Sequence, residues 1–402
     1  MKRQRKKIII TLLIAPVVFF SHSTFSQAII SLDSAFATAL RSHPSILQSQ
    51  TQIVQQQQLV KSSFSLANPE FGIEIPAHDF SWTVSQSIEF PLVYTNQSKL
   101  GRANIALAQQ SLAITQNELH SEVMSAFLQL QFSEAQMAEL KKQDSLFFAV
   151  SNANDRRYGA GEIGLLEKLN ANNAYQNKHN LLVQSQTDFL TAQKQLLILT
   201  GSTASNPRPD QPLIKFVVPQ VVLTDSVAPF TNLFSGYAIK NSMVALRNWK
   251  LEKSKALPGF FGTYFNNGGK PADVVTPSRF DLGISFPLWF WQYSARNKAA
   301  KYQWQAANYQ MQATTLAVNV EWQQALSDFK KFSSSLNYYE TSALPQADKI
   351  IDASTRSYRA GEIGYIELLQ NLSVAFQTKL DYLDAIRDFN QAIIQLHKLS
   401  GQ

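Results

Sequence analysis

Residues 158–167 read YGAGEIGLLE, and residues 358–367 read YRAGEIGYIE. The spacing of 200 residues also relates the triplet Leu199–Gly201 to Leu399–Gly401. Residues 88–92 (IEFPL) and 284–288 (ISFPL) also match, at a spacing of 196. Matches at several points indicate that the chain is built from two copies of one structural plan.

The repeats divide the chain into four segments. Residues 27–201 are expected to form the first repeat and residues 236–402 the second, each with a helix, two strands and a long helical hairpin. Residues 202–235 contain five prolines and short β-branched runs, which predicts an irregular connector with at most a strand or two. Residues 1–26 are expected to be a signal peptide.

The N-terminus has the layout of a cleaved secretory signal. A basic cap precedes an apolar run at Ile8–Phe20, and Thr24 and Ser26 are small residues in the positions expected before a cleavage site. The run is too short to cross a bilayer comfortably. We therefore expect export, with an uncleaved anchor as the alternative.

The net charge depends largely on that cap. The chain has 36 Lys plus Arg against 29 Asp plus Glu, and removing the five basic residues at positions 2–7 leaves 31 against 29, or +2. A nearly neutral mature chain does not suggest a nucleic-acid partner. The absence of cysteine excludes disulfides, thiolate metal sites and lipid attachment through a cysteine.

Helices dominate the predicted structure. Ser31 is a candidate cap for a helix that continues through the glutamines near 55–58. Apolar residues at three-and-four spacing from Leu112 to Phe147 predict a helix over about 97–158, roughly 90 Å long. The chain is then expected to turn at Ala160-Gly161 and to return along a helix that ends near Gly201. In the second half, Pro345 predicts a kink.

Short alternating segments predict strands. Alternation occurs near residues 70–75 and 81–90, and again over 279–288, where Trp289, Phe290 and Trp291 follow as a candidate membrane aromatic girdle. A half-buried sheet in a soluble domain is the alternative. Four strands cannot close a barrel, and open edges cannot face lipid, so a membrane-spanning form requires several copies. Three copies supply 12 strands, enough for a water-filled lumen.

Taken together, these features resemble the TolC family of outer-membrane efflux proteins. The likeness runs from Leu32-Asp33-Ser34-Ala35 to the terminal Leu-Ser-Gly, and similarity to the heavy-metal exporters (the cobalt–zinc–cadmium and copper–silver systems) rests on 86–94, 336–340 and 343–348. The resemblance implies a mainly α fold with a small membrane β part. It also implies that long antiparallel hairpins and four strands per chain trimerise into a 12-stranded barrel and a helical tunnel.

The resemblance also implies partners and a location. The chain is expected to form a homotrimer in the lipid of the bacterial outer membrane, with its helices in the periplasm. It is expected to bind a periplasmic adaptor protein and, with it, an inner-membrane pump of the resistance-nodulation-division class. Its expected function is the exit duct of a tripartite efflux pump for heavy-metal cations. Alternatives within this class are drug or detergent efflux and type I protein secretion.

Particular residues are assigned by the same resemblance. The hairpin turns correspond to the adaptor-contacting tip, with Tyr158, Gly161 and Glu162 in one turn and Tyr358, Gly361 and Glu362 in the other. Glu367, with Glu167 at the matching place, corresponds to the acidic ring of the pore, and Tyr358 to a gate-closing tyrosine. Ile363 stands where some relatives have a basic residue, so the closed-state bonding is expected to differ. Plain turn glycines and solvated surface glutamates are the alternatives.

Other classes of function find less support. The six histidines are scattered, and neither a G-x-S-x-G nucleophile motif nor a phosphate-binding glycine loop is present. We therefore expect no enzyme activity, no cofactor and no resident metal. A periplasmic coiled-coil adaptor or scaffold is the alternative from a different class, but such proteins do not repeat both the hairpin and the strand pair.

Overall fold

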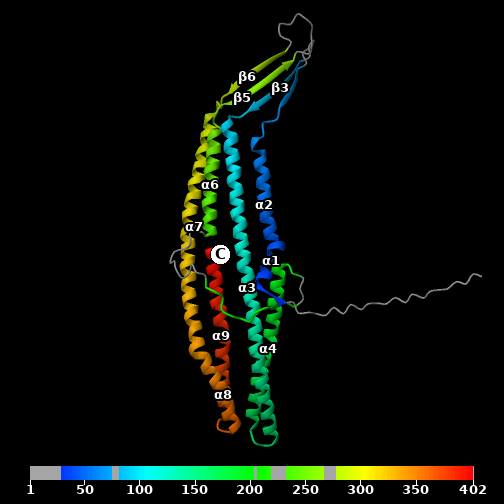
Figure 1. Cartoon of the computed structure of the whole chain (residues 1–402), viewed down its shortest axis with the longest axis vertical. Coiled ribbons are helices and arrows are strands. Elements are labelled where there is room, and N and C mark those ends of the chain that lie inside the picture. The colour runs from blue at the N-terminus through cyan, green and yellow to red at the C-terminus, as the bar shows by residue number, and fades with distance from the viewer. Residues whose placement is uncertain (1–28, 75–80, 203–205, 219–231, 267–277, 402) are drawn as a thin grey trace, which may run out of the picture.

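A computed structural model describes residues 29–74, 81–202, 206–218, 232–266 and 278–401. The expected signal peptide lies outside these residues. The molecule is an elongated column of helices with a sheet at one end and two helical turns at the other (Figure 1). Within the described part of the chain, no helix is both long and apolar enough to cross a bilayer.

The first half begins with a capped helix. Ser31 accepts a hydrogen bond from the backbone N–H of Ser34 at 3.2 Å, and Ser34 Oγ accepts one from the backbone N–H of Ser31 at 3.1 Å, so α1 (Leu32–Ser42) starts with a capping box. The break before α2 (Pro44–Lys61) falls at Pro44, since proline disfavours a helical residue before it. A short 3₁₀ turn (η1, Ser62–Phe64) follows.

One helix spans nearly the whole column. After β2 (Glu70–Glu74) and β3 (Ser81–Ile88), α3 runs unbroken through Pro91–Gly159. Its 69 residues correspond to about 104 Å at the usual rise. The helix starts six residues earlier than predicted because Pro91 occupies its first turn, where the missing N–H costs nothing. The return helix α4 (Leu165–Thr200) ends at Gly201, which adopts φ +64°, as predicted.

The second half repeats these elements. They are α6 (Leu233–Ser254), β5 (Gly259–Asn266), β6 (Ser278–Ser285), α7 (Phe290–Tyr338), a π-helical turn η2 (Tyr339–Ala343), α8 (Leu344–Ala360) and α9 (Tyr365–Ser400). The predicted kink at Pro345 is confirmed as this π-turn. Helix α6 is capped by Asn232 and begins at Leu233, three residues before the predicted start of the second repeat at residue 236.

The connector between the halves follows a defined path. Its strand β4 (Arg208–Pro209) pairs in parallel with β1 (Ile29–Ile30). From there it crosses α3 towards α9, as Figure 1 shows. Between residues 206 and 218, which the structure describes, this strand is the only regular element of the connector.

The four long strands form one antiparallel sheet in the order β2-β3-β5-β6. Residues Phe71, Val84, Tyr264 and Phe280 are paired in one row and so share a face, whereas Ser85, Thr263 and Asp281 share the other. The apolar face is open to the surroundings, with Phe280 78% exposed. Strands β2 and β6 are unpaired edges in the single chain.

Two strand predictions need correction. The strand predicted over 279–288 ends at Ser285, since Pro287 has no N–H to donate to a ladder and Phe290 already begins α7. Strand β5 was not located from the sequence, although four strands per chain were expected. Its run Gly259–Asn266 contains aromatic residues on both faces, so the period of two is obscured.

The largest core lies at mid-height, where α1 packs against α3 and α4. Leu119, Val123 and Leu130 of α3 are buried there, together with Phe189 and Leu196 of α4. A second cluster near the turns joins Phe147 of α3 to Leu368, Leu372 and Phe376 of α9. The heptad residues of α3 therefore contact different helices at different heights, and the second cluster holds the two hairpins together near the candidate site.

Candidate functional site at the hairpin tips

The two hairpin turns have the same backbone. Gly161 and Gly361 both adopt φ +76°, a left-handed conformation that favours glycine. In each turn the glycine N–H donates to the carbonyl of the tyrosine three residues earlier, at 3.0 and 3.1 Å, and the next glutamate N–H closes the turn at 2.9 Å. A side chain on either glycine would meet no atom within 4 Å, so both turns are open to a partner.

The side chains of the two turns differ. The guanidinium of Arg157 lies 3.2 Å from the Glu162 carboxylate, whereas the matching position in the second half is Ser357. Glu362 therefore lacks the counterion that Glu162 has. The two turns have equal formal charge, because Arg359 in the second turn is matched by Gly159 in the first, but their charged side chains are placed differently.

Tyr358 links the two hairpins. Its hydroxyl accepts a hydrogen bond from Nη1 of Arg157 at 3.3 Å and donates one to Oδ1 of Asn154 at 3.3 Å. The Tyr358 hydrogen bond, with a further contribution from Glu162, raises the pKa of Arg157, while partial desolvation opposes it. The basic partner of this tyrosine thus comes from the first hairpin.

The equivalent tyrosine has another role. The ring of Tyr158 lies under the ammonium of Lys168, 5.0 Å from its centroid, and Lys168 Nζ lies 3.4 Å from Asp155. These contacts stay within the first hairpin. Of the two tip tyrosines predicted from the repeat, Tyr358 therefore joins the hairpins and Tyr158 does not.

A hollow of about 740 Å³ lies between the two turns. Arg157, Glu162, Glu167, Tyr358 and Tyr365 are among the residues that line it. Tyr365 is 3% exposed, and its hydroxyl has no hydrogen-bond partner among the described residues. Burial raises the pKa of Tyr365, with smaller contributions from Tyr358 and Glu167, so the hydroxyl keeps its proton.

The two predicted pore glutamates occupy different places. Glu167 is half-buried and lines the hollow within the chain, whereas Glu367 is exposed and outside it. Within the described residues Glu367 has no ion-pair partner. Glu367 is therefore the glutamate that is free to face other copies of the chain.

The predicted girdle residues lie at the other end of the column. Trp289 is the residue before α7 and Trp291 lies in its first turn, with their rings 5.1 Å apart and both side chains exposed. The side chain of Phe290 lies outside the described part of the structure. The sequence did not predict a second aromatic row, in which Phe71, Trp82, Tyr264 and Phe280 contact one another across all four strands.

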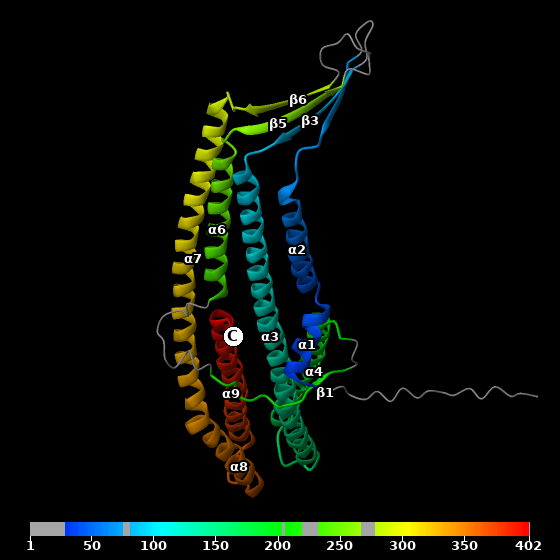
Figure 2. The same ribbon diagram turned by 45° about the horizontal axis from the view of Figure 1, so that its top comes forward.

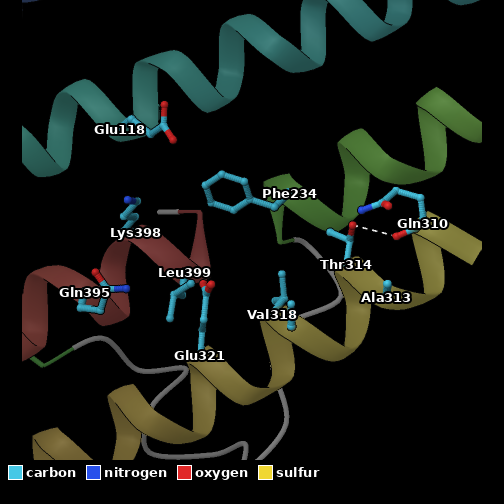
Figure 3. Close-up of a pocket in the computed structure, with 11 residues that line it drawn as sticks. Glu118, Phe234, Gln310, Ala313, Thr314, Val318, Glu321, Gln395, Lys398 and Leu399 are labelled. Carbon is cyan, nitrogen blue, oxygen red and sulfur yellow. Dashed lines mark hydrogen bonds between the residues drawn. The ribbon is translucent and has the colours of Figure 1, made fainter. Parts of the chain in front are cut away.

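A separate cavity of about 480 Å³ occurs where the end of α9 meets the start of α6 (Figure 3). Figure 3 shows Glu118 of α3, Glu321 of α7 and Lys398 of α9 around the ring of Phe234. Asn232 and Asn117 donate to the carbonyls of Leu399 and Lys398, both at 2.7 Å, and so join the helix ends. This mixed-charge gap belongs to the helix junction. No group of three or more metal-ligating side chains occurs in the ranges that the structure describes.

Comparison with known proteins agrees with this architecture. Residues 243–402 match the family model described as outer membrane efflux protein. The match begins within α6 and runs to the end of the chain, so it covers less than half of the residues. The second half of the chain is therefore similar to outer membrane efflux proteins, in agreement with the resemblance found in the sequence.

Individual relatives are distant in sequence. The cobalt-zinc-cadmium resistance protein CzcC of Cupriavidus metallidurans is 20% identical over 308 residues, covering 74% of this chain and 71% of CzcC. The outer-membrane channel CmeC of Campylobacter jejuni matches with a TM-score of 0.77 at 14% identity, over 92% of this chain and 85% of CmeC. CusC matches with a TM-score of 0.76 at 14% identity, over 96% of each chain. At this identity the structural matches show the fold.

Several tip residues were not anticipated from the sequence. Arg157, Asn154 and Tyr365 were not singled out, although the first two bond to Tyr358 and the third lines the hollow. Comparison of the two repeats contained a signal, because Arg157 is matched by Ser357 and Tyr365 by Leu165. Because the two turns have the same backbone, a difference in residue type at matched positions indicates a difference in side-chain contacts.

Proposed function

We propose that three copies of this chain form the exit duct of a tripartite efflux pump that exports heavy-metal cations. The main support for a duct is the four-stranded sheet, which has an apolar face and two unpaired edges. Unpaired backbone groups are costly in lipid, so β6 of one copy must pair with β2 of the next until the ring closes. The metal cargo is supported by the similarity to CzcC.

Exposed apolar residues on the helices support the same assembly. Helix α7 carries a stripe at heptad-like spacing, with Tyr302, Tyr309, Leu316 and Val320 each about 70% exposed. Helix α2, on the opposite flank in Figures 1 and 2, carries exposed Leu47 and Val54. A head-to-tail contact between these two flanks buries both stripes and generates a closed ring.

The sheet also supports placement in the outer membrane. Its apolar face contacts lipid, and its aromatic row and the Trp289–Trp291 pair lie towards opposite ends of the sheet, where aromatic girdles occur in membrane barrels. The helices then extend into the periplasm. This orientation brings the hairpin turns towards the inner membrane.

The tips are the proposed contact with a periplasmic adaptor, which connects the duct to an inner-membrane pump of the resistance-nodulation-division class. Leu165, Leu166 and Ile366 are 54%, 72% and 72% exposed beside the open glycine turns. Glu362 adds an exposed carboxylate that forms no ion pair within the described residues. An adaptor tip with aliphatic and basic side chains complements this surface.

Glu367 is the proposed acidic ring of the pore. Three copies bring three such carboxylates around the axis, which attracts cations and repels anions. The Arg157–Tyr358–Asn154 contact holds the neighbouring hairpin in place and so keeps the periplasmic end closed. Glu167 has a lesser role because it faces the hollow inside its own chain.

The cargo is tested by growth of a deletion strain on graded zinc, cobalt, cadmium, copper and silver, with dyes and bile salts alongside. Sensitivity to metals that the intact gene reverses supports metal export, and the ions affected identify the pump. Sensitivity to dyes and bile salts alone would keep the duct and replace the cargo with drugs or detergents. If the strain is sensitive to none of these compounds but a protein disappears from the culture medium, the result would indicate type I secretion.

The trimer is tested by cysteine crosslinking, because the chain has no cysteine of its own. A Val54→Cys and Tyr309→Cys double variant treated with a bifunctional maleimide is expected to yield species of up to three chains. Each single variant is the matched control and should remain monomeric on a denaturing gel. Crosslinking that stops at two chains would contradict the head-to-tail ring.

A further inference from the structure

The two long helices of the chain differ by one unusual turn. Helix α3 of the first half is unbroken, whereas its counterpart contains the π-turn Tyr339–Ala343 between α7 and α8. The spacing between matched motifs rises from 196 to 200 residues across this helix, so the second half has four extra residues. Four residues exceed one α-helical turn by about 0.4 residue. A widened turn absorbs that excess.

The π-turn also lacks part of the usual backbone support. Pro345 has no N–H, so the carbonyl of Thr341 cannot receive the hydrogen bond that an α-helix would supply there. In Figures 1 and 2 the column formed by α7 and α8 bends towards α9 near its lower end. The π-turn is therefore the point at which the second hairpin can change direction relative to the rest of the column.

The connector is fastened to the helices around this point. Gln193 of α4 donates to the carbonyl of Pro207 at 2.8 Å, and Gln131 of α3 donates to the carbonyl of Gln211 at 3.1 Å. On the other side, fully buried Asn390 of α9 accepts from the N–H of Phe216 at 2.8 Å and donates to the carbonyl of Ile214 at 2.7 Å. The connector thus ties α9 to both helices of the first half.

One ion pair joins the connector to the π-turn itself. Nζ of Lys215 lies 3.0 Å from Oε2 of Glu340, the second residue of the turn. Leu213 and Phe216 pack beside it against a cluster that contains Leu336, Ile386 and Phe389. The turn is consequently held by a charge contact from a segment anchored elsewhere.

We propose that α8 and the tip-ward part of α9 pivot about this π-turn when the duct opens, and that Lys215 and Glu340 position the turn in the closed state. The proposal rests on the proposed duct and extends it to the control of opening. Movement at the tip breaks the Tyr358 contact with Arg157, while the Lys379–Asp348 pair at 2.7 Å keeps α8 and α9 together as one moving body. Opening then requires the Lys215–Glu340 pair to be released or rearranged.

The size of the effect follows from exposure. The side chains of Lys215 and Glu340 are 51% and 31% exposed, and ion pairs of this kind contribute weakly and are screened by salt. Loss of the pair should therefore raise the ratio of open to closed channels by about two- to five-fold at low ionic strength. The increase should disappear near 1 M salt.

The test uses purified full-length trimers in planar bilayers, where the open fraction is measured at 0.05 and 1 M KCl. We expect Lys215→Glu and Glu340→Lys each to increase opening at low salt, and the double charge swap to restore the wild-type value. Asp352→Ala is the matched control, because it removes an exposed ion pair with Arg356 that lies wholly within α8 and should leave the open fraction unchanged. Recovery by the swap distinguishes positioning of the turn from general damage.

A second variant tests the turn rather than the ion pair. Pro345→Ala restores the missing N–H, which should favour an ordinary helix and lower the open fraction by a similar factor. Unchanged opening in all of these variants, in trimers that conduct, would overturn the pivot and leave the duct intact. An absence of conductance from wild-type trimers would overturn the duct, and the pivot with it.

Discussion

The hydroxyl of Tyr358 in the second hairpin lies 3.3 Å from Nη1 of Arg157 in the first. The same hydroxyl bonds to the buried amide of Asn154. This contact is the link between the hairpin tips, and it exists because the two repeats differ: Ser357 cannot form the reciprocal bond at the matching place. The two repeats are thus joined at their tips by a contact of Tyr358 that Tyr158 does not reproduce.

We predict that Tyr358→Phe or Arg157→Ala increases the conductance of the trimer. Each change removes a hydrogen bond to a charged group, which at this partly exposed site is worth about 1 kcal/mol, or roughly a five-fold shift towards opening. Single-channel recording in planar bilayers measures the change. Tyr158→Phe is the matched control, because its ring contacts only its own hairpin, and an equal effect of that change would contradict the assignment of the link.

We predict that Glu367→Gln lowers the cation-over-anion selectivity of the trimer more than Glu167→Gln does. Glu367 is exposed and unpaired in the described chain, so its charge can face the axis, whereas Glu167 faces a hollow inside its own chain. The reversal potential across a salt gradient measures the selectivity. Equal loss in both variants, or no loss in either, would remove the acidic-ring assignment.

Cysteines at the tip are expected to crosslink to the adaptor in cells. At Gly361 a cysteine must adopt φ +76°, which costs a non-glycine residue about 1–2 kcal/mol, so Gly361→Cys should also lower thermal stability. Gly364→Cys is the control for strain, since Gly364 has φ −77° and open space around it. Both variants should crosslink, and crosslinking only to reagents outside the cell would invert the proposed topology.

Two histidines should make stability sensitive to acid. Burial lowers the pKa of His120 and of His397, and the charge of His397 lowers that of His120 further, against a small opposing effect of Asp33. Below the ordinary pKa of about 6.5 the unfolded chain binds more protons than the folded one, so the free energy of unfolding falls as the pH decreases through this range. The contribution of the two neutral histidines to stability is present above about pH 6.5 and is lost as the pH falls below it.

Thermal unfolding in detergent, followed by circular dichroism at pH 7.5 and 5.5, measures this dependence. The melting temperature of the wild type should fall at pH 5.5, and His120→Gln should reduce the size of that fall. His179→Gln is the control, because His179 is half-exposed and pairs with Asp144 on the surface of the first hairpin. A pH dependence that is identical in all three proteins would contradict the prediction.

The sequence predicted the helices better than the strands. Capping at Ser31, the turns at Gly161 and Gly361, and the helix end at Gly201 are local effects of single residues on the backbone, so they are visible without knowledge of the partners. Strand β5 was missed because aromatic residues occupy both of its faces. On one face the ring of Phe261 lies across Gly283, which has no side chain to obstruct it. Because these two residues are paired between β5 and β6, the place of Phe261 is understood only from the sheet.

The candidate site was predicted in position but not in contacts. The repeat placed Tyr158 and Tyr358, and Glu167 and Glu367, at equivalent points, and the resemblance gave them similar roles. The structure separates them, because Arg157 and Asn154 reach Tyr358 from a helix 200 residues away in sequence. No local pattern encodes which hairpin lies beside which.

The sequence by itself therefore determined the duplicated plan, the long hairpins and the glycine turns, because helix periodicity and positive φ angles depend on neighbouring residues. The tertiary structure decided that Tyr358 rather than Tyr158 joins the hairpins, that Glu367 rather than Glu167 is free, and that Lys215 braces the π-turn at Glu340. These relationships arise from the packing of segments distant in sequence. They follow from which surfaces the helices bury, and this is settled only when the whole column is assembled.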